Sequence, residues 1–148
     1  MKEIRRSALV STTPRVLFGL INDVERYPEF LPWCVAARLE SSSESEVVAS
    51  LTVKRGPLRT EFTTRNTLVP DHSIQMNFLR GPFDALEGCW TLTAVGDSGC
   101  RVELQLKFQF SNAVSAVVLE PVFAEMAASL VDAFVVRART ASRAEPES

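Results

Sequence analysis

The chain has little of the chemistry that metal centres and nucleophilic catalysis require. Its 148 residues include one histidine, His72, in the turn-like stretch Pro70–Ser73. A single histidine without a cysteine or histidine neighbour makes a poor set of metal ligands. It also leaves one imidazole for any Ser-His-Asp or Cys-His mechanism. We therefore expect no metal site, no catalytic residues and no required cofactor.

Cysteines are also few. The chain has three cysteines, Cys34, Cys89 and Cys100, so at least one has no partner within the chain, and no two of them are spaced as C-x-x-C. This usage is typical of reduced thiols in a reducing compartment.

No long uninterrupted apolar run is present. The first residues, Met1–Arg6, are charged, and no apolar segment typical of a signal peptide follows them. The most apolar stretch, residues 112–139, contains several carboxylates and Pro121, whereas a membrane span needs roughly 20 apolar residues with few or no charges. We therefore expect a cytoplasmic protein.

Strong charge of either sign is absent as well. The formal net charge is −2, which argues against DNA as a partner held through bulk charge, although a local basic patch would still suit RNA. The length fits one domain, and the apolar fraction of 46% suffices for a core.

The stretch Asn112–Arg139 has a strong helical pattern. Asn112 suits an N-cap, and large apolar residues recur at helical spacing on one face: Leu119, Phe123, Met126, Leu130 and Phe134. The opposite face carries Glu125, Asp132 and Arg139. This helix either closes a core or forms the lid of a cavity, and Pro121 should kink it.

The N-terminal third predicts a strand at residues 3–11 and then two short helical pieces. Thr13-Pro14 is a typical helix start. Residues 23–34 combine two prolines with Tyr27, Phe30 and Trp33, which indicates a broken helix and an extended exit. These three rings are too apolar to stay in water, so we expect them to form a mouth or a plug.

From residue 35 to residue 110, apolar side chains recur at every second position in six runs separated by short turns. Val35, Ala37 and Leu39 open the first run, and Val102–Phe110 is the most regular. Short turns between strands make the sheet antiparallel. The predicted fold class is α+β: a curved seven-stranded antiparallel sheet wrapped around the long C-terminal helix.

Several segments resemble the START-like (helix-grip) superfamily, in the branch that holds the coenzyme Q-binding proteins and the ribosome association toxin RatA. They are Asp23-Val24-x-x-Tyr27-Pro28-x-Phe30-Leu31-Pro32, Phe62-Thr63-Thr64-Arg65-Asn66, Gly81-Pro82-Phe83, Leu86-x-Gly88-x-Trp90, Phe108-x-Phe110-x-Asn112 and Ala133-Phe134-x-x-Arg137-Ala138. The resemblance implies one domain over residues 1–141, and we expect residues 142–148 to form a disordered tail.

The first function that the resemblance implies is non-enzymatic binding of a lipophilic molecule, such as ubiquinone or a polyketide-like compound, linked to respiration. The protein would then contact a membrane peripherally when it exchanges its ligand. Asn66 shares a predicted strand face with Phe62, so its amide should point inward and could meet a quinone carbonyl, or else a neighbouring backbone group. The expected cavity residues are Tyr27, Phe30, Trp33, Phe62, Asn66, Phe78, Trp90, Phe123, Leu130 and Phe134. The alternative for the aromatic residues is an ordinary core.

The second implied function is that of a toxin of a toxin-antitoxin pair, which binds the large ribosomal subunit and blocks subunit association. The expected contact is a patch of Lys54, Arg55 and Arg59, with other arginines on nearby strands: Arg38, Arg65 and Arg80. The alternative is a solvated charged face. A third implied function is aromatase/cyclase activity. The sequence gives it little support, because Glu87 and Glu103 have outward parity on their predicted strands and would not reach the interior.

Overall fold

The computed structural model describes residues 1–144, with side chains through residue 140, and contains one seven-stranded sheet. Every neighbouring pair is antiparallel, in the order β1-β7-β6-β5-β4-β3-β2. The strands are β1 (Lys2–Val10), β2 (Cys34–Ser42), β3 (Glu46–Arg55), β4 (Leu58–Val69), β5 (Ser73–Arg80), β6 (Phe83–Val95) and β7 (Gly99–Phe110). The predicted α+β class and the antiparallel sheet are confirmed.

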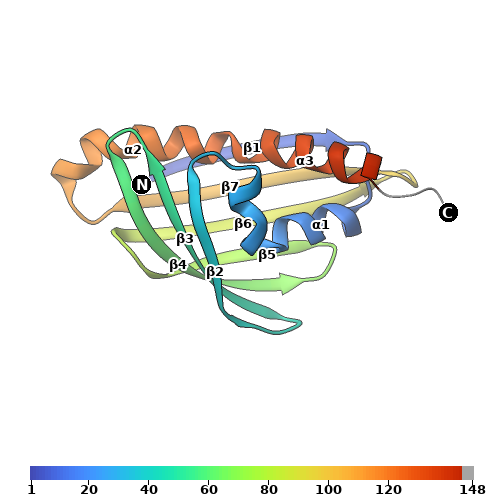
Figure 1. Ribbon diagram of the computed structural model, residues 1–148, viewed down its shortest axis with the longest axis horizontal. Helices are drawn as coiled ribbons and strands as arrows, with labels where there is room; N and C mark the ends of the chain where they lie inside the picture. The colour runs from blue at the N-terminus through green and yellow to red at the C-terminus, as the bar shows by residue number, and fades with distance from the viewer. Residues whose placement is uncertain (145–148) are drawn as a thin grey trace.

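The helices cover one face of this curved sheet (Figure 1). They are α1 (Pro14–Asn22), the 3₁₀ helix η1 (Val24–Glu29), α2 (Ala113–Ala128) and α3 (Leu130–Ala144). The core lies between the two layers. On β7 the predicted alternation is confirmed, because every second side chain is buried: Val102, Leu104, Leu106, Phe108 and Phe110.

The region between β1 and β2 forms the two expected helical pieces. The hydroxyl of Thr13 accepts a hydrogen bond from the backbone N–H of Val16, and Pro14 begins α1. Pro28 lies inside η1, where the short 3₁₀ geometry tolerates it. The buried Tyr27 hydroxyl donates to the carbonyl of Ile21, which ties η1 back to α1.

The C-terminal helix, in which the sequence predicts a kink at Pro121, is divided into α2 and α3 at Ser129. The Ser129 hydroxyl donates to the Met126 carbonyl at 2.7 Å, which is a bond that competes with the helical ladder. The backbone N–H of Ala133 still bonds the carbonyl of Ser129, so α3 continues nearly in line with α2 (Figure 1). Pro121 is exposed within α2, where the carbonyl that it leaves free can bond water.

Val35 and Leu39 are less buried than the alternation predicts, although Leu39 is the register partner of the buried Ala49 and shares its inward face. They are 50% and 36% exposed, because β2 is the edge strand and its register with β3 shifts between Cys34 and Ala36 and again between Leu39 and Ser41. A bulge of this kind displaces side chains from regular alternation. Helix α3 extends through Ala144, three residues beyond the expected end of the domain, and residues 145–148 of the expected tail lie outside the described part of the chain.

Candidate functional site

A cavity of about 90 Å³ lies between the concave face of the sheet and the terminal helix. Strand residues form its floor, and Phe123, Met126 and Leu130 form part of its roof on both sides of the break at Ser129. The lining is almost entirely apolar. The terminal helix is therefore the lid of this space as well as a part of the core.

Eight of the ten expected cavity residues line this space: Tyr27, Trp33, Phe62, Asn66, Trp90, Phe123, Leu130 and Phe134. Phe30 and Phe78 do not. Phe30 packs edge-on against Phe134 with the Arg137 guanidinium over its other side, and Phe78 packs against Phe83. Both rings pack against other aromatic side chains instead of lining the cavity.

Aromatic rings occupy most of the interior. Phe123 contacts Phe62, Phe83 and Phe108 with centroid separations of 4.7 to 6.0 Å, and Phe134 contacts Tyr27 and Trp90. The remaining space is smaller than the roughly 150 Å³ of an engineered cavity that takes up benzene, and far below the roughly 300–1,000 Å³ of drug-sized ligand pockets. A quinone ring would fit only if the lid moved outward.

Thr64 and Asn66 are the polar groups of the cavity wall. Both are buried, and the Thr64 hydroxyl donates to Oδ1 of Asn66 at 2.8 Å. This bond engages Oδ1 of Asn66, so the amide NH₂ is the end of the side chain that remains to donate. Thr64 was not among the residues predicted to line the cavity, although its parity on β4 equals that of Asn66.

Two titratable groups at the interior are held in their neutral forms by burial. Burial raises the pKa of the Tyr27 hydroxyl well above its ordinary range, and it raises the pKa of the Cys34 thiol to about 11. Glu87 and Glu103 are exposed on the outer face of the sheet. Within the described residues, no three His, Cys, Asp or Glu side chains are grouped closely enough to hold a metal ion.

The expected basic patch of Lys54, Arg55 and Arg59 is divided between two faces. Lys54 and Arg59 are cross-strand neighbours on the outer face of the β3–β4 hairpin, and neither forms an ion pair with a described residue. Arg55 points to the opposite side and binds Glu125 on α2, with 2.6 Å between the nitrogen and oxygen. The prediction of one three-residue patch is wrong, because adjacent strand residues alternate between faces.

The turn before β6 explains one of the motifs in the sequence. Gly81 has a φ of +142°, and a Cβ at this position would lie 2.7 Å from Cβ of Phe62. A glycine is therefore required for the β5–β6 turn to pass close to β4. Phe83, which follows, stacks on Phe110 and fills the narrow end of the core.

The terminal helix, Ala113–Thr140, is long and apolar enough to span a membrane by length and composition alone. In the structure its inward face is packed against the sheet through Phe123, Met126 and Phe134. Its first turns also expose Val114, Val117 and Val118.

Comparisons with known proteins agree with this architecture. Residues 10–135 match the family described as polyketide cyclase/dehydrase and lipid transport. A ribosome association toxin RatA from Pseudomonas aeruginosa is 48% identical over 92% of this chain and 94% of its own length. The RatA of Escherichia coli is 40% identical over 94% of this chain and 88% of its own length. A mitochondrial coenzyme Q-binding protein COQ10 homolog B from Xenopus laevis is more distant, at 23% identity over 89% of this chain and 56% of its own length.

Two solved structures are similar over nearly the whole chain. The 18 kDa protein CC1736 of Caulobacter crescentus has a TM-score of 0.77 at 32% identity, covering 97% of this chain and 100% of that one. The Zhui aromatase/cyclase from Streptomyces has a TM-score of 0.84 at 16% identity, covering 97% and 96%, which is a likeness of fold alone. The chain therefore belongs to the polyketide cyclase/dehydrase and lipid transport family of START-like, helix-grip proteins.

Proposed function

We propose that this protein acts at the ribosome, which the name of its relatives, ribosome association toxin RatA, supports. The proposed action is that it binds the large ribosomal subunit and hinders the association of the subunits. The observation that carries this proposal is the 48% identity to a RatA protein over 92% of the chain. The proposed role is non-enzymatic and cytoplasmic.

The interior of the fold supports a role that depends on a surface. A cavity of about 90 Å³ needs no ligand to complete the core, because side chains fill nearly all of the space. The exposed cations Lys54 and Arg59 stand side by side on the outer face and are available to phosphate groups.

Light scattering of purified ribosomal subunits tests the proposal. Separated small and large subunits are mixed with magnesium in the presence of increasing protein, and the rise in scattered light reports their association. The proposal predicts a smaller rise as the protein approaches the concentration of large subunits. An unchanged rise at a several-fold excess of protein would contradict it.

A second candidate function is binding of a lipophilic small molecule that carries a carbonyl, such as a quinone. The amide of Asn66 supports it, since it is a buried donor in an otherwise apolar cavity. The terminal helix that covers the cavity would have to move outward to admit such a ligand. If the ligand came from a membrane, the protein would have to contact the membrane surface peripherally. Mass spectrometry of an organic extract of the folded protein tests this candidate, and an extract without a stoichiometric lipophilic compound would count against it.

A further inference from the structure

A row of four side chains crosses four strands on the outer face of the sheet. Arg38 on β2 is the register partner of Ser50 on β3, which pairs with Thr63 on β4, which pairs with Arg80 on β5. Two guanidinium groups thus lie on either side of two hydroxyls. This face is opposite to the helices and to the cavity.

The two central hydroxyls are buried although they belong to the outer face. Ser50 and Thr63 are each only 2% exposed, and their oxygens lie 2.6 Å apart. Arg80 approaches the Thr63 hydroxyl at 3.4 Å, and its side chain remains 60% exposed. Arg80 therefore covers the Thr63 hydroxyl while keeping its own charged end at the surface.

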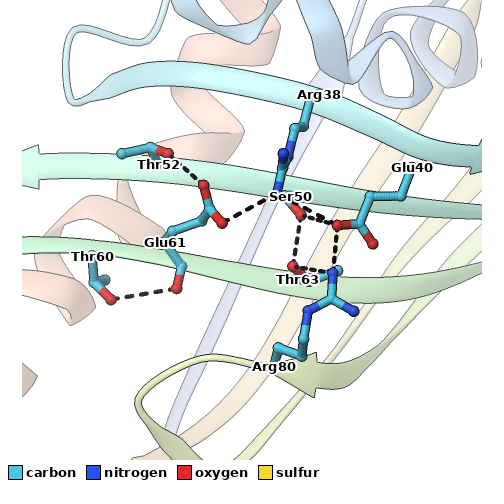
Figure 2. Close-up of polar contacts among 8 residues, drawn as sticks. All are labelled: Arg38, Glu40, Ser50, Thr52, Thr60, Glu61, Thr63 and Arg80. Carbon is cyan, nitrogen blue, oxygen red and sulfur yellow. Dashed lines mark hydrogen bonds and ion pairs between the residues drawn. The ribbon is translucent and has the colours of Figure 1, made fainter.

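Two irregularities in the strands build this arrangement. The register of β2 steps from Leu39↔Ala49 to Ser41↔Val48, which leaves Glu40 without a partner on β3. On β5, Phe78 and Arg80 are two residues apart but pair with two adjacent residues of β4, so β5 contains one extra residue here. Bulges of this kind re-aim side chains, and here they bring Glu40 and Arg80 to the central hydroxyls (Figure 2).

The carboxylate of Glu40 occupies the centre of these donors. It accepts hydrogen bonds from Arg80 and, at 3.3 Å, from Ser50, and Arg38 lies 3.6 Å away (Figure 2). Arg80 and the other donors lower the pKa of this carboxyl, so it stays ionised at neutral pH. A carboxylate of the protein itself thus fills a position where a singly charged oxyanion meets three donor groups: Arg80, Ser50 and Arg38.

The outer face of the same strands also carries an excess of positive charge. On their outer face, strands β2 to β5 carry five cationic side chains and three acidic ones, a net charge of +2, in a chain whose formal net charge is −2. Lys54, Arg59 and Arg65 extend the row of four along the outer face. Such a local excess favours a polyanion over other partners.

We propose that the outer face of β2–β5 is a docking surface for the phosphate backbone of RNA, in which the row Arg38–Ser50–Thr63–Arg80 binds phosphate oxygens in place of Glu40. Guanidinium groups and hydroxyls are the donors that commonly contact phosphate. Glu40 occupies the row in the free protein and lowers its affinity for RNA until a phosphate displaces it. This inference rests on the proposed ribosomal function, for which it names the contact surface.

The experiment compares two double variants. R38A/R80A removes the two guanidinium groups of the row. R5A/R101A is the matched control, because it removes two exposed arginines on β1 and β7 that also pair with glutamates, Glu3 and Glu103. Fluorescence anisotropy with a labelled RNA duplex and pelleting with large ribosomal subunits are both measured, and thermal unfolding midpoints verify that each variant is folded.

The proposal predicts that R38A/R80A binds the duplex at least about tenfold more weakly, since hydrogen bonds to charged groups are lost. The slope of log Kd against log salt concentration should decrease in magnitude by about 2, one for each phosphate contact. R5A/R101A should keep its affinity within about threefold, because distant surface charges are screened. E40Q should bind more tightly than the native protein, and weaker binding by E40Q would overturn the displacement of Glu40.

The outcomes distinguish this surface from the function on which it rests. Equal binding of ribosomes by both double variants and the native protein would overturn the surface and leave the ribosomal function standing. Duplex binding that R38A/R80A abolishes, without any ribosome binding, would support the surface and contradict the ribosomal function. A native protein that binds neither RNA nor ribosomes would overturn both.

Discussion

Arg55 at the end of β3 donates from Nη2 to Oε1 of Glu125 on α2 at 2.6 Å, which links the β3–β4 hairpin to the terminal helix. The two side chains are 42% and 66% exposed. An ion pair that is this exposed to solvent contributes less than about 1 kcal/mol to the free energy of unfolding. E125Q and R55A should therefore each lower the free energy of unfolding by no more than that amount, in a urea titration. A double-mutant cycle with a coupling energy of several kcal/mol would contradict this description of the link.

Phe134 on α3 is fully buried and contacts Tyr27, Phe30 and Trp90. F134A should lower the free energy of unfolding by about 3–5 kcal/mol, because it removes a buried ring and leaves a cavity. V136A on the same helix should change it by less than about 0.5 kcal/mol, since Val136 is 59% exposed. Similar effects from both variants would mean that the faces of α3 are assigned wrongly.

Asn66 provides a test of the second candidate function. N66L should reduce affinity for a short-chain quinone by about the 0.5–1.5 kcal/mol of one neutral hydrogen bond, measured as quenching of the fluorescence of Trp33 and Trp90. T64V is the matched control, because it removes the partner of the Asn66 oxygen and leaves the amide NH₂ in place. Quenching of the native protein that does not saturate would contradict quinone binding in this cavity.

Cys34 should be much less reactive than the half-buried Cys89. Burial raises its pKa from 9.0 to about 11, so only about a thousandth of it is thiolate at pH 8. The half-buried Cys89 should react first with iodoacetamide in the folded protein, as peptide mass spectrometry can show. Because the pKa is higher in the folded state, this group contributes stability that is complete below pH 9 and is lost as the pH rises towards 11. Faster alkylation of Cys34 than of Cys89 would contradict its burial.

The regular parts of this fold could be predicted from the sequence because each element has one buried face. On strand β4, Leu58, Phe62, Asn66 and Leu68 share one parity, and the apolar members of this set indicate that Phe62 and Asn66 point inward. The spacing of Phe123, Met126 and Phe134 likewise identifies the inward face of the terminal helix. The arrangement of these elements as a helix-grip fold was predicted from the resemblance of the motifs to START-like proteins.

The remaining features depend on contacts between segments that a pattern does not reveal. The exposure of Val35 follows from a bulge in β2, and the break at Ser129 follows from one side-chain hydrogen bond. Outward parity could be predicted for Ser50, but its burial depends on Arg80 from a strand that is not its neighbour. Lys54, Arg55 and Arg59 are close in sequence, so the sequence predicted a patch at the β3–β4 turn. The row of Arg38, Ser50, Thr63 and Arg80 comes together only through the pairing of four strands.

The central claim is that this protein binds the large ribosomal subunit, and sedimentation tests it most directly. Purified protein is centrifuged through sucrose with isolated large or small subunits at several salt concentrations. We predict that it sediments with the large subunit at about 50 mM salt and is released by about 200 mM, because several phosphate contacts lose orders of magnitude in affinity over this range. Protein that stays at the top of the gradient with large subunits at 50 mM salt would contradict the claim.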